Sequence, residues 1–127
     1  MSERARRTAV VIEDDEGIRS LICDVLKHAG LRVVPTTNGI DGITAVREHD
    51  PAVVTVDLRM PGIDGIETTK RIRATSSALI VVLSARVTDA DEFESLAAGA
   101  DAYISKPFRP RELRARVDEH LHESRSA

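Results

Sequence analysis

Residues 52–57 read AVVTVD and residues 79–84 read LIVVLS, two mainly apolar runs that each end in a polar side chain. Neither run alternates apolar and polar residues, and such continuous runs are typical of strands covered on both faces, as in a parallel sheet. The polar residues at the two ends are Asp57 and Ser84. The two runs therefore predict the centre of a parallel sheet, with polar groups where neighbouring strands end.

Three further short runs and five amphipathic segments extend this pattern along the chain. Strands are expected over residues 8–12, 31–36, 52–56, 79–83 and 102–105, and helices over the segment that ends at Gly30, over 39–49, 65–74 and 89–98, and from Pro110 on. Alternating strands and helices form right-handed βαβ units, which place helices on both faces of a parallel sheet. Pro35 in the second run cannot donate a ladder hydrogen bond, so this strand is expected at an edge. The predicted fold is a doubly wound α/β domain of the flavodoxin-like type, with a five-stranded parallel sheet in the order 2-1-3-4-5.

Individual residues mark the ends and inner faces of the expected helices. Asn38 is a predicted N-cap, and Gly30 and Gly99 are predicted to stop the helices that precede them. Leu21 and Ile40 keep helical spacing with their apolar neighbours, so both are expected to face the core.

The composition limits the class of protein. A length of 127 residues suits one domain, with a core over about residues 8–121 and flexible tails at 1–7 and 122–127. The net charge of -3 is the wrong sign for a dedicated nucleic-acid binder, so no direct nucleic-acid contact is expected. The single cysteine, Cys23, cannot form an internal disulfide, and the sequence shows no signal-peptide pattern or membrane-length apolar run. We therefore expect a cytoplasmic protein without membrane contact.

Polar side chains follow four of the five expected strands at the same edge of the sheet. They are Glu13 and Asp14 after the first strand, Asp57 after the third, Ser84 after the fourth and Lys106 after the fifth. Three converging carboxylates repel one another unless a cation lies among them, and oxygen ligands favour a hard divalent ion. The sequence therefore predicts a Mg²⁺ site, which Mn²⁺ could also fill.

Asp57 is the candidate nucleophile of this site. A carboxylate can attack phosphorus to form an acyl phosphate when a metal ion and a cation offset the charge of the transferred group. Lys106 supplies the cation, and the Ser84 hydroxyl can donate to a phosphoryl oxygen. Because Ser84 lies between a strand and a helix, it can move when that bond forms and so act as a sensor.

Four segments carry a resemblance to a known family: VIEDD at 11–15, VDLRMPGIDG at 56–65, LSA at 83–85 and SKPF at 105–108. Over residues 8–121 the chain resembles the receiver domain of response regulators in two-component systems, of the chemotaxis-regulator type. The resemblance implies a bacterial signalling switch that a sensor histidine kinase phosphorylates on Asp57 in a Mg²⁺-dependent reaction. The surface formed by the fourth helix, fifth strand and fifth helix would then change to control an output domain or target protein. The implied chemistry is the domain's own phosphoryl transfer and slow autodephosphorylation, and not the turnover of a separate substrate.

The resemblance also implies the ligands of the metal ion. Asp14 and Asp57 would bind Mg²⁺ directly. The backbone carbonyl of Arg59 would complete the protein ligands, and Glu13 would act on the metal through water.

Further residues match the family's switching elements. Ser84 and Lys106 would contact the phosphoryl group. Tyr103 matches the switch aromatic, which turns inward when Ser84 is drawn toward the phosphate. The Lys106–Pro107 peptide matches one that is usually cis in the family.

Three arginines depart from common family patterns. Arg59 and Arg86 each stand two residues beyond a site residue, at positions that vary in the family and influence how readily water reaches the acyl phosphate. We hypothesise that one of them hydrogen-bonds the phosphoryl group and alters its lifetime. Arg109 stands where a small N-capping residue often precedes the last helix, which predicts a weaker cap or one supplied by backbone and water.

Opposite charges are concentrated on the last two expected helices. The acids of the fourth are Asp89, Asp91, Glu92 and Glu94, and the arginines at the fifth are Arg109, Arg111, Arg114 and Arg116. We expect these helices to lie side by side, so a twofold dimer would place the acidic surface of one copy against the basic surface of the other. The alternative is that both surfaces are simply solvated.

Other interpretations of the same residues remain open. Glu13 and Asp14 could merely stabilise a helix N-terminus, and Tyr103 could be a half-buried strand residue without a switching role. A flavin carrier would need aromatic or glycine-rich phosphate loops, which the sequence lacks. An aspartate phosphatase of the haloacid dehalogenase type would need a second aspartate where Arg59 stands. A degenerate receiver that signals without phosphate is the last alternative, although the acid pair, acceptor, hydroxyl and lysine are all present.

Overall fold

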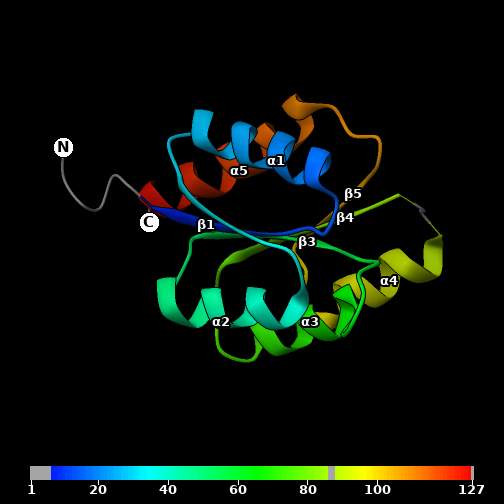
Figure 1. The fold of residues 1–127 in the computed structure, drawn as a ribbon. Coiled ribbons are helices and arrows are strands. Elements are labelled where there is room, and N and C mark those ends of the chain that lie inside the picture. Colours follow the sequence, from blue (N-terminus) through cyan, green and yellow to red (C-terminus); the bar gives the residue numbers. More distant parts are fainter. Residues whose placement is uncertain (1–6, 86–87, 127) are drawn as a thin grey trace.

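The computed structural model describes residues 7–85 and 88–126, in which two layers of helices enclose one sheet (Figure 1). The strands are β1 (Thr8–Ile12), β2 (Arg32–Thr36), β3 (Val53–Asp57), β4 (Leu79–Ser84) and β5 (Ala102–Ser105). All neighbouring strands are parallel, in the order β2-β1-β3-β4-β5. The predicted five-stranded, doubly wound fold is confirmed, and β2 with Pro35 lies at an edge.

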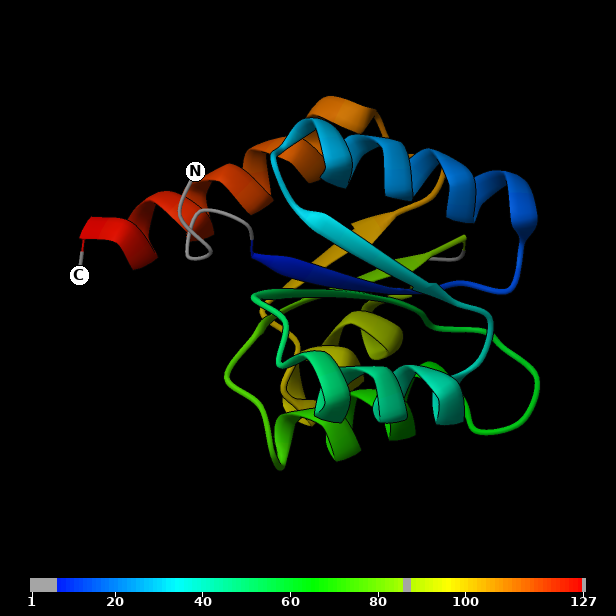
Figure 2. The same ribbon diagram turned by 60° about the vertical axis from the view of Figure 1, so that its left-hand side comes forward.

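The helices divide between the two faces of the sheet. They are α1 (Glu16–His28), α2 (Gly39–His49), α3 (Gly65–Arg73), α4 (Asp89–Ala98) and α5 (Pro110–Ser126). One face is covered by α1 and α5 and the other by α2, α3 and α4 (Figures 1 and 2). The expectation that α4 and α5 lie side by side is therefore wrong. The right-handed crossover from β4 to β5 packs α4 on α3, whereas the chain after β5 returns across the opposite face to pack α5 on α1.

The central strands are covered on both faces, which explains their continuous apolar sequences. Val81 and Leu83 of β4 pack with α1 and α5, whereas Ile80 and Val82 pack with α2 and α3. Successive side chains of a strand point to opposite faces, so every position of β4 before Ser84 contributes to a core. Across the described residues, no helix has both the length and the apolar character of a membrane span.

Caps start and stop the helices close to the strand ends. Asn38 accepts a hydrogen bond from a first-turn N–H at 2.8 Å, which confirms it as the N-cap of α2. Gly30 and Gly99 follow α1 and α4 with φ of 89° and 118°, a left-handed conformation that glycine adopts at little cost, and both stops are confirmed. Before α5, the N–H of Arg109 donates to a carboxylate oxygen of Glu112 at 3.1 Å. A side chain therefore contributes here, where a weaker cap or one supplied by backbone and water was expected.

Gly65 brings the start of α3 directly against the end of β3. A Cβ atom at this position would lie 2.5 Å from the carbonyl oxygen of Asp57 and 2.6 Å from the Cα atom of Leu58. Any larger residue would push the helix away from the strand. The glycine therefore allows the loop that follows Asp57 to stay short and close to the sheet.

Two apolar side chains lie outside the core, contrary to the prediction. Leu21 on α1 and Ile40 on α2 are exposed. Each lies at the rim of the apolar arc of its helix. Because neighbouring helix positions differ by about 100° in direction, apolar spacing alone does not separate the rim of such an arc from its centre.

Candidate phosphoryl-acceptor and metal site

The carboxyl ends of β1, β3 and β5 bring Glu13, Asp57 and Lys106 into one cluster of charged groups. Lys106 Nζ lies 2.8 Å from Glu13 Oε1 and 3.5 Å from Asp57 Oδ1, and both carboxylates are buried. The parallel register pairs Ile12 with Val56. The residues that follow these two positions therefore emerge side by side at the same edge of the sheet.

Asp14 is the third carboxylate of this site. One oxygen each of Glu13, Asp14 and Asp57 lies within 4.8 Å of the other two, and Asp14 alone of the three is exposed. One lysine ammonium contacts this group of three acids, so the site carries excess negative charge. A closely spaced, all-oxygen donor set that is open to water on the Asp14 side fits Mg²⁺, which usually retains several water ligands.

Burial raises the pKa of Glu13 from its usual range to about 7. The hydrogen bond from Lys106 opposes this rise, whereas the negative charge of Asp57 adds to it. Glu13 is thus a buried carboxyl that one lysine does not fully stabilise in its charged form. A second cation among these oxygens would favour the ionised form.

Backbone contacts fix the acidic residues, and one involves an arginine that the sequence analysis missed. Arg19 of α1 donates to the carbonyl oxygens of Glu13 at 3.0 Å and Asp14 at 3.3 Å. Arg19 stands four residues after Asp15, the N-cap of α1, and this spacing is a signal that its side chain can reach back to the loop. On the other side of the site, the backbone N–H of Arg59 donates to the carboxylate of Asp57 at the end of β3.

Ser84 and Tyr103 lie on the two strands beyond β3. Ser84 is fully buried at the end of β4, and its carbonyl oxygen accepts a hydrogen bond from the N–H of Lys106 at 2.6 Å. Since Asp57 is paired with Leu83, Ser84 lies one residue further toward the carboxyl edge. Tyr103 is half-buried on β5 and packs on the core beneath α2 and α3. Of the two, Ser84 is the residue next to the acidic site.

The family of the chain follows from a match over most of its length. Residues 9–118 match the family model of the response regulator receiver domain. This chain is a receiver domain of the response regulator family. Its Lys106–Pro107 peptide bond is cis, as the resemblance implied.

Proteins similar to this receiver domain include longer chains. It is 47% identical over 102 residues to a protein-glutamate methylesterase/protein-glutamine glutaminase of Natronomonas pharaonis, covering 78% of this chain and 29% of that protein. It is 39% identical over 116 residues to the DNA-binding response regulator MtrA of Mycolicibacterium paratuberculosis, covering 91% of this chain and 52% of that protein. Among solved structures, the BeF3-activated DrrB receiver domain matches with a TM-score of 0.86 and 30% identity, over 92% of this chain and 98% of that one. The chain thus spans about half or less of the two longer relatives.

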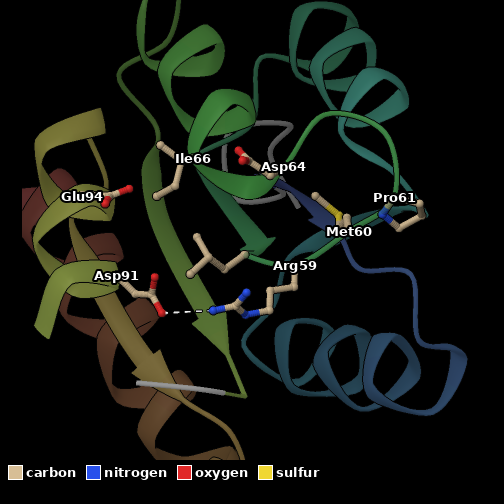
Figure 3. A pocket seen from close by; sticks show the side chains of 8 residues that line it. Arg59, Met60, Pro61, Asp64, Ile66, Asp91 and Glu94 are labelled. Carbon is tan, nitrogen blue, oxygen red and sulfur yellow. Dashed lines mark hydrogen bonds and ion pairs between the residues drawn. The ribbon is translucent and has the colours of Figure 1, made fainter. Parts of the chain in front are cut away.

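In this receiver domain Arg59 has two separate contacts. Its backbone N–H donates to Asp57 Oδ1 at 3.2 Å, whereas its side-chain Nη2 lies 3.3 Å from Asp91 Oδ2 on α4 (Figure 3). Asp91 was not predicted as a partner of Arg59, because one residue lies in the β3–α3 loop and the other on α4, 32 positions further along the chain. The second predicted modulator, Arg86, lies outside the described residues.

The exposed part of α4 in the receiver domain carries two large apolar side chains. Phe93 is 73% exposed, and Leu96 lies one turn further along and is also exposed. On α5, Arg114 pairs with Asp118 of the same helix at 3.0 Å. The predicted surface of opposite charges therefore also contains an apolar patch and an arginine with a partner in its own helix.

Proposed function

We propose that this receiver domain is a phosphorylation-activated switch of a two-component system, in which Asp57 accepts a phosphoryl group from a sensor histidine kinase. The observation that carries the proposal is the contact of Lys106 with the buried carboxylates of Asp57 and Glu13, at 3.5 and 2.8 Å. A buried nucleophile beside a cation, with two more carboxylates at metal-binding distance, meets the requirements of phosphoryl transfer.

The proposed reaction depends on Mg²⁺ at the three carboxylates. Asp14 and Asp57 would hold the ion directly. The backbone carbonyl of Arg59 would complete the protein ligands, and Glu13 would act through water. Bound there, the ion would supply positive charge that offsets the charge on the transferred oxygens.

Asp57 would act as the nucleophile. One of its oxygens forms a bond to phosphorus while the bond from phosphorus to the donor imidazole nitrogen breaks, and that nitrogen keeps the electron pair. Lys106 would offset negative charge on the phosphoryl oxygens, which form strong hydrogen bonds with an ammonium group. Its existing contact with Asp57 supports this role, because a small movement away from Glu13 would bring the ammonium onto the new group.

Ser84 and Tyr103 would convert phosphorylation into a change of shape. The Ser84 hydroxyl would donate to a phosphoryl oxygen, and Tyr103 would turn inward as Ser84 moved. Two observations support this switch: Ser84 follows the strand partner of Asp57, and Tyr103 is half-buried on the next strand.

The α4–β5–α5 surface would control an output domain or target protein, and phosphorylation would favour a homodimer through it. Exposed Phe93 and Leu96 on α4 support a role of this helix in binding. In a twofold dimer, acids of α4 such as Glu92 would lie against arginines of α5 such as Arg111. The proposal includes a cytoplasmic location, without contact of this domain with membranes or nucleic acid.

Arg59 and Arg86 would modulate the lifetime of the acyl phosphate by hydrogen bonds to its phosphoryl group. The hydrogen bond between the Arg59 N–H and Asp57 supports this role for Arg59, because it places the start of the side chain beside the acceptor. Unchanged dephosphorylation rates in both Arg59→Ala and Arg86→Ala would contradict it.

Intact mass after incubation with Mg²⁺ and acetyl phosphate tests the proposed reaction. We expect a gain of one phosphoryl group in the wild type and none in Asp57→Asn or with a chelator. Asp64→Asn is the matched control. It changes an exposed carboxylate in the loop that follows Asp57, and an asparagine at this position can still cap α3. If folded wild-type protein gains no phosphoryl group from either acetyl phosphate or a phosphorylated kinase, signalling without phosphate becomes the better explanation.

A further inference from the structure

A groove lies between the β3–α3 loop, α3 and α4 (Figure 3). Its lining includes Leu58, the residue that follows the proposed phosphoryl acceptor. Its volume is about 470 Å³, and three acids, Asp64, Asp91 and Glu94, line it. Arg59 is the one cation among the described residues that line this groove. Its guanidinium crosses the groove and reaches Asp91 on α4, with 3.3 Å between Nη2 and Oδ2.

The backbone of Arg59 is held beside Asp57, whereas its guanidinium lies on α4. Its N–H donates to Asp57 Oδ1 at 3.2 Å, so the side chain starts beside the carboxylate that would be phosphorylated. A guanidinium can bind two phosphoryl oxygens at once, and a phosphoryl group carries up to about two negative charges against the single charge of Asp91. After phosphorylation, two anions would therefore compete for one arginine.

We propose that Asp91 is a positioning residue that holds the Arg59 guanidinium on α4 and thereby shortens the lifetime of phosphorylated Asp57. This inference rests on the proposed function. The Arg59 side chain is mostly exposed and that of Asp91 is partly exposed, and ion pairs with such exposure are weak and exchange readily. The pair therefore limits the contact of Arg59 with the phosphoryl group without preventing it.

The step that Asp91 influences is hydrolysis of the acyl phosphate. A water oxygen forms a bond to phosphorus, and the bond between phosphorus and the Asp57 oxygen breaks. Asp57 keeps the electron pair as a carboxylate, and a water proton goes to the released phosphate. A guanidinium bound to the phosphoryl oxygens covers part of the approach of water, so Arg59 released from Asp91 slows this step.

The same pair connects the phosphoryl group with α4, which belongs to the proposed output surface. A partner that engaged Asp91 would release Arg59 and prolong the phosphorylated state. Conversely, Arg59 drawn onto the phosphoryl group would leave Asp91 free for the partner, so phosphorylation would also strengthen the binding of that partner.

The lifetime of the phosphorylated protein tests this inference, followed by intact mass in Mg²⁺ after acetyl phosphate is removed. We expect Asp91→Asn to retain the phosphoryl group about two- to fivefold longer than the wild type, the range that an exposed ion pair can shift. In an Arg59→Gln background the same change should have no effect. Asp91→Glu keeps the charge and should restore the wild-type lifetime. Asp89→Asn removes a charge from the same first turn of α4 and should leave the lifetime unchanged.

Three results would overturn the inference while the proposed function stands. They are equal lifetimes of the wild type and Asp91→Asn, a shorter lifetime in Asp91→Asn, and an effect that persists in the Arg59→Gln background. A folded wild type that neither acetyl phosphate nor a phosphorylated kinase phosphorylates would instead contradict the proposed function, and this inference with it.

Discussion

Two ion pairs flank Asp57 in this receiver domain, and they differ in their surroundings. Lys106 and Glu13 are 10% and 1% exposed at a distance of 2.8 Å, whereas Arg59 and Asp91 are 61% and 22% exposed at 3.3 Å. Breaking a buried pair leaves an uncompensated charge and costs roughly 3–5 kcal/mol, whereas an exposed pair contributes about 0–1 kcal/mol. The same type of contact therefore fixes the position of side chains in the first pair and leaves them exchangeable in the second.

Lys106→Met is the substitution with the largest expected effect, because it breaks the buried pair. We expect the free energy of unfolding to fall by roughly 2–3 kcal/mol at pH 8 without Mg²⁺, less than the full cost because Glu13 can bind a proton. Urea denaturation measures this change. Lys70→Met, at an exposed position of α3, is the control and should change stability little. Equal stabilities of the two variants would show that breaking the buried pair costs no more than losing an exposed lysine.

The pKa of Glu13 predicts a pH dependence for the buried pair. Because burial raises this pKa from 4.5 to about 7, the unfolded chain releases the proton at a lower pH than the native protein does. The native state then binds more protons, so the contribution of Glu13 to stability is present below about pH 4.5 and is lost as the pH rises through about 7. The unfolding free energy of the wild type, relative to Glu13→Gln, should fall by roughly 2–3 kcal/mol over this window in metal-free buffer.

Mg²⁺ provides the control for this pH dependence. Added at pH 8, it should recover part of the lost stability in the wild type, because a ligand that binds only the native state stabilises it. Asp14→Asn should recover less, since it lacks one proposed ligand. A difference between wild type and Glu13→Gln that stays constant with pH would show that Glu13 titrates in its usual range.

The fold could be predicted from the sequence because its determinants are local. Continuous apolar runs such as residues 79–83 predicted strands with two buried faces. The side chain of Asn38 caps α2 by accepting a hydrogen bond from an N–H only three residues further along the chain. The convergence of Glu13 and Asp57 was likewise predictable, since parallel strands end at one edge of a sheet. These sequence patterns do not determine which side chains contact one another at this edge, or the distances between them.

The contacts that the sequence analysis missed depend on how elements pack. Arg59 and Asp91 are 32 positions apart, and they meet only because α4 packs beside α3 next to the β3–α3 loop. The closer approach of Lys106 to Glu13 than to Asp57 is set by the relative positions of three strand ends. Neither contact has a periodic signal, because each depends on the rotamers of long side chains placed by distant parts of the chain.

Asp91→Asn should have the smallest effect on stability, although the same substitution is expected to change the phosphoryl lifetime. We expect the unfolding free energy of the unphosphorylated protein to change by less than about 0.5 kcal/mol, of which part is the lost attraction of Asp91 to the N-terminus of α4. Asp89→Asn loses a similar attraction to this N-terminus, so the difference in stability between the two variants measures the contribution of the ion pair. A double-mutant cycle with Arg59→Gln measures the coupling directly. A coupling above about 1.5 kcal/mol would make the exposed pair comparable to a buried one, and Arg59 could then not exchange readily between Asp91 and the phosphoryl group.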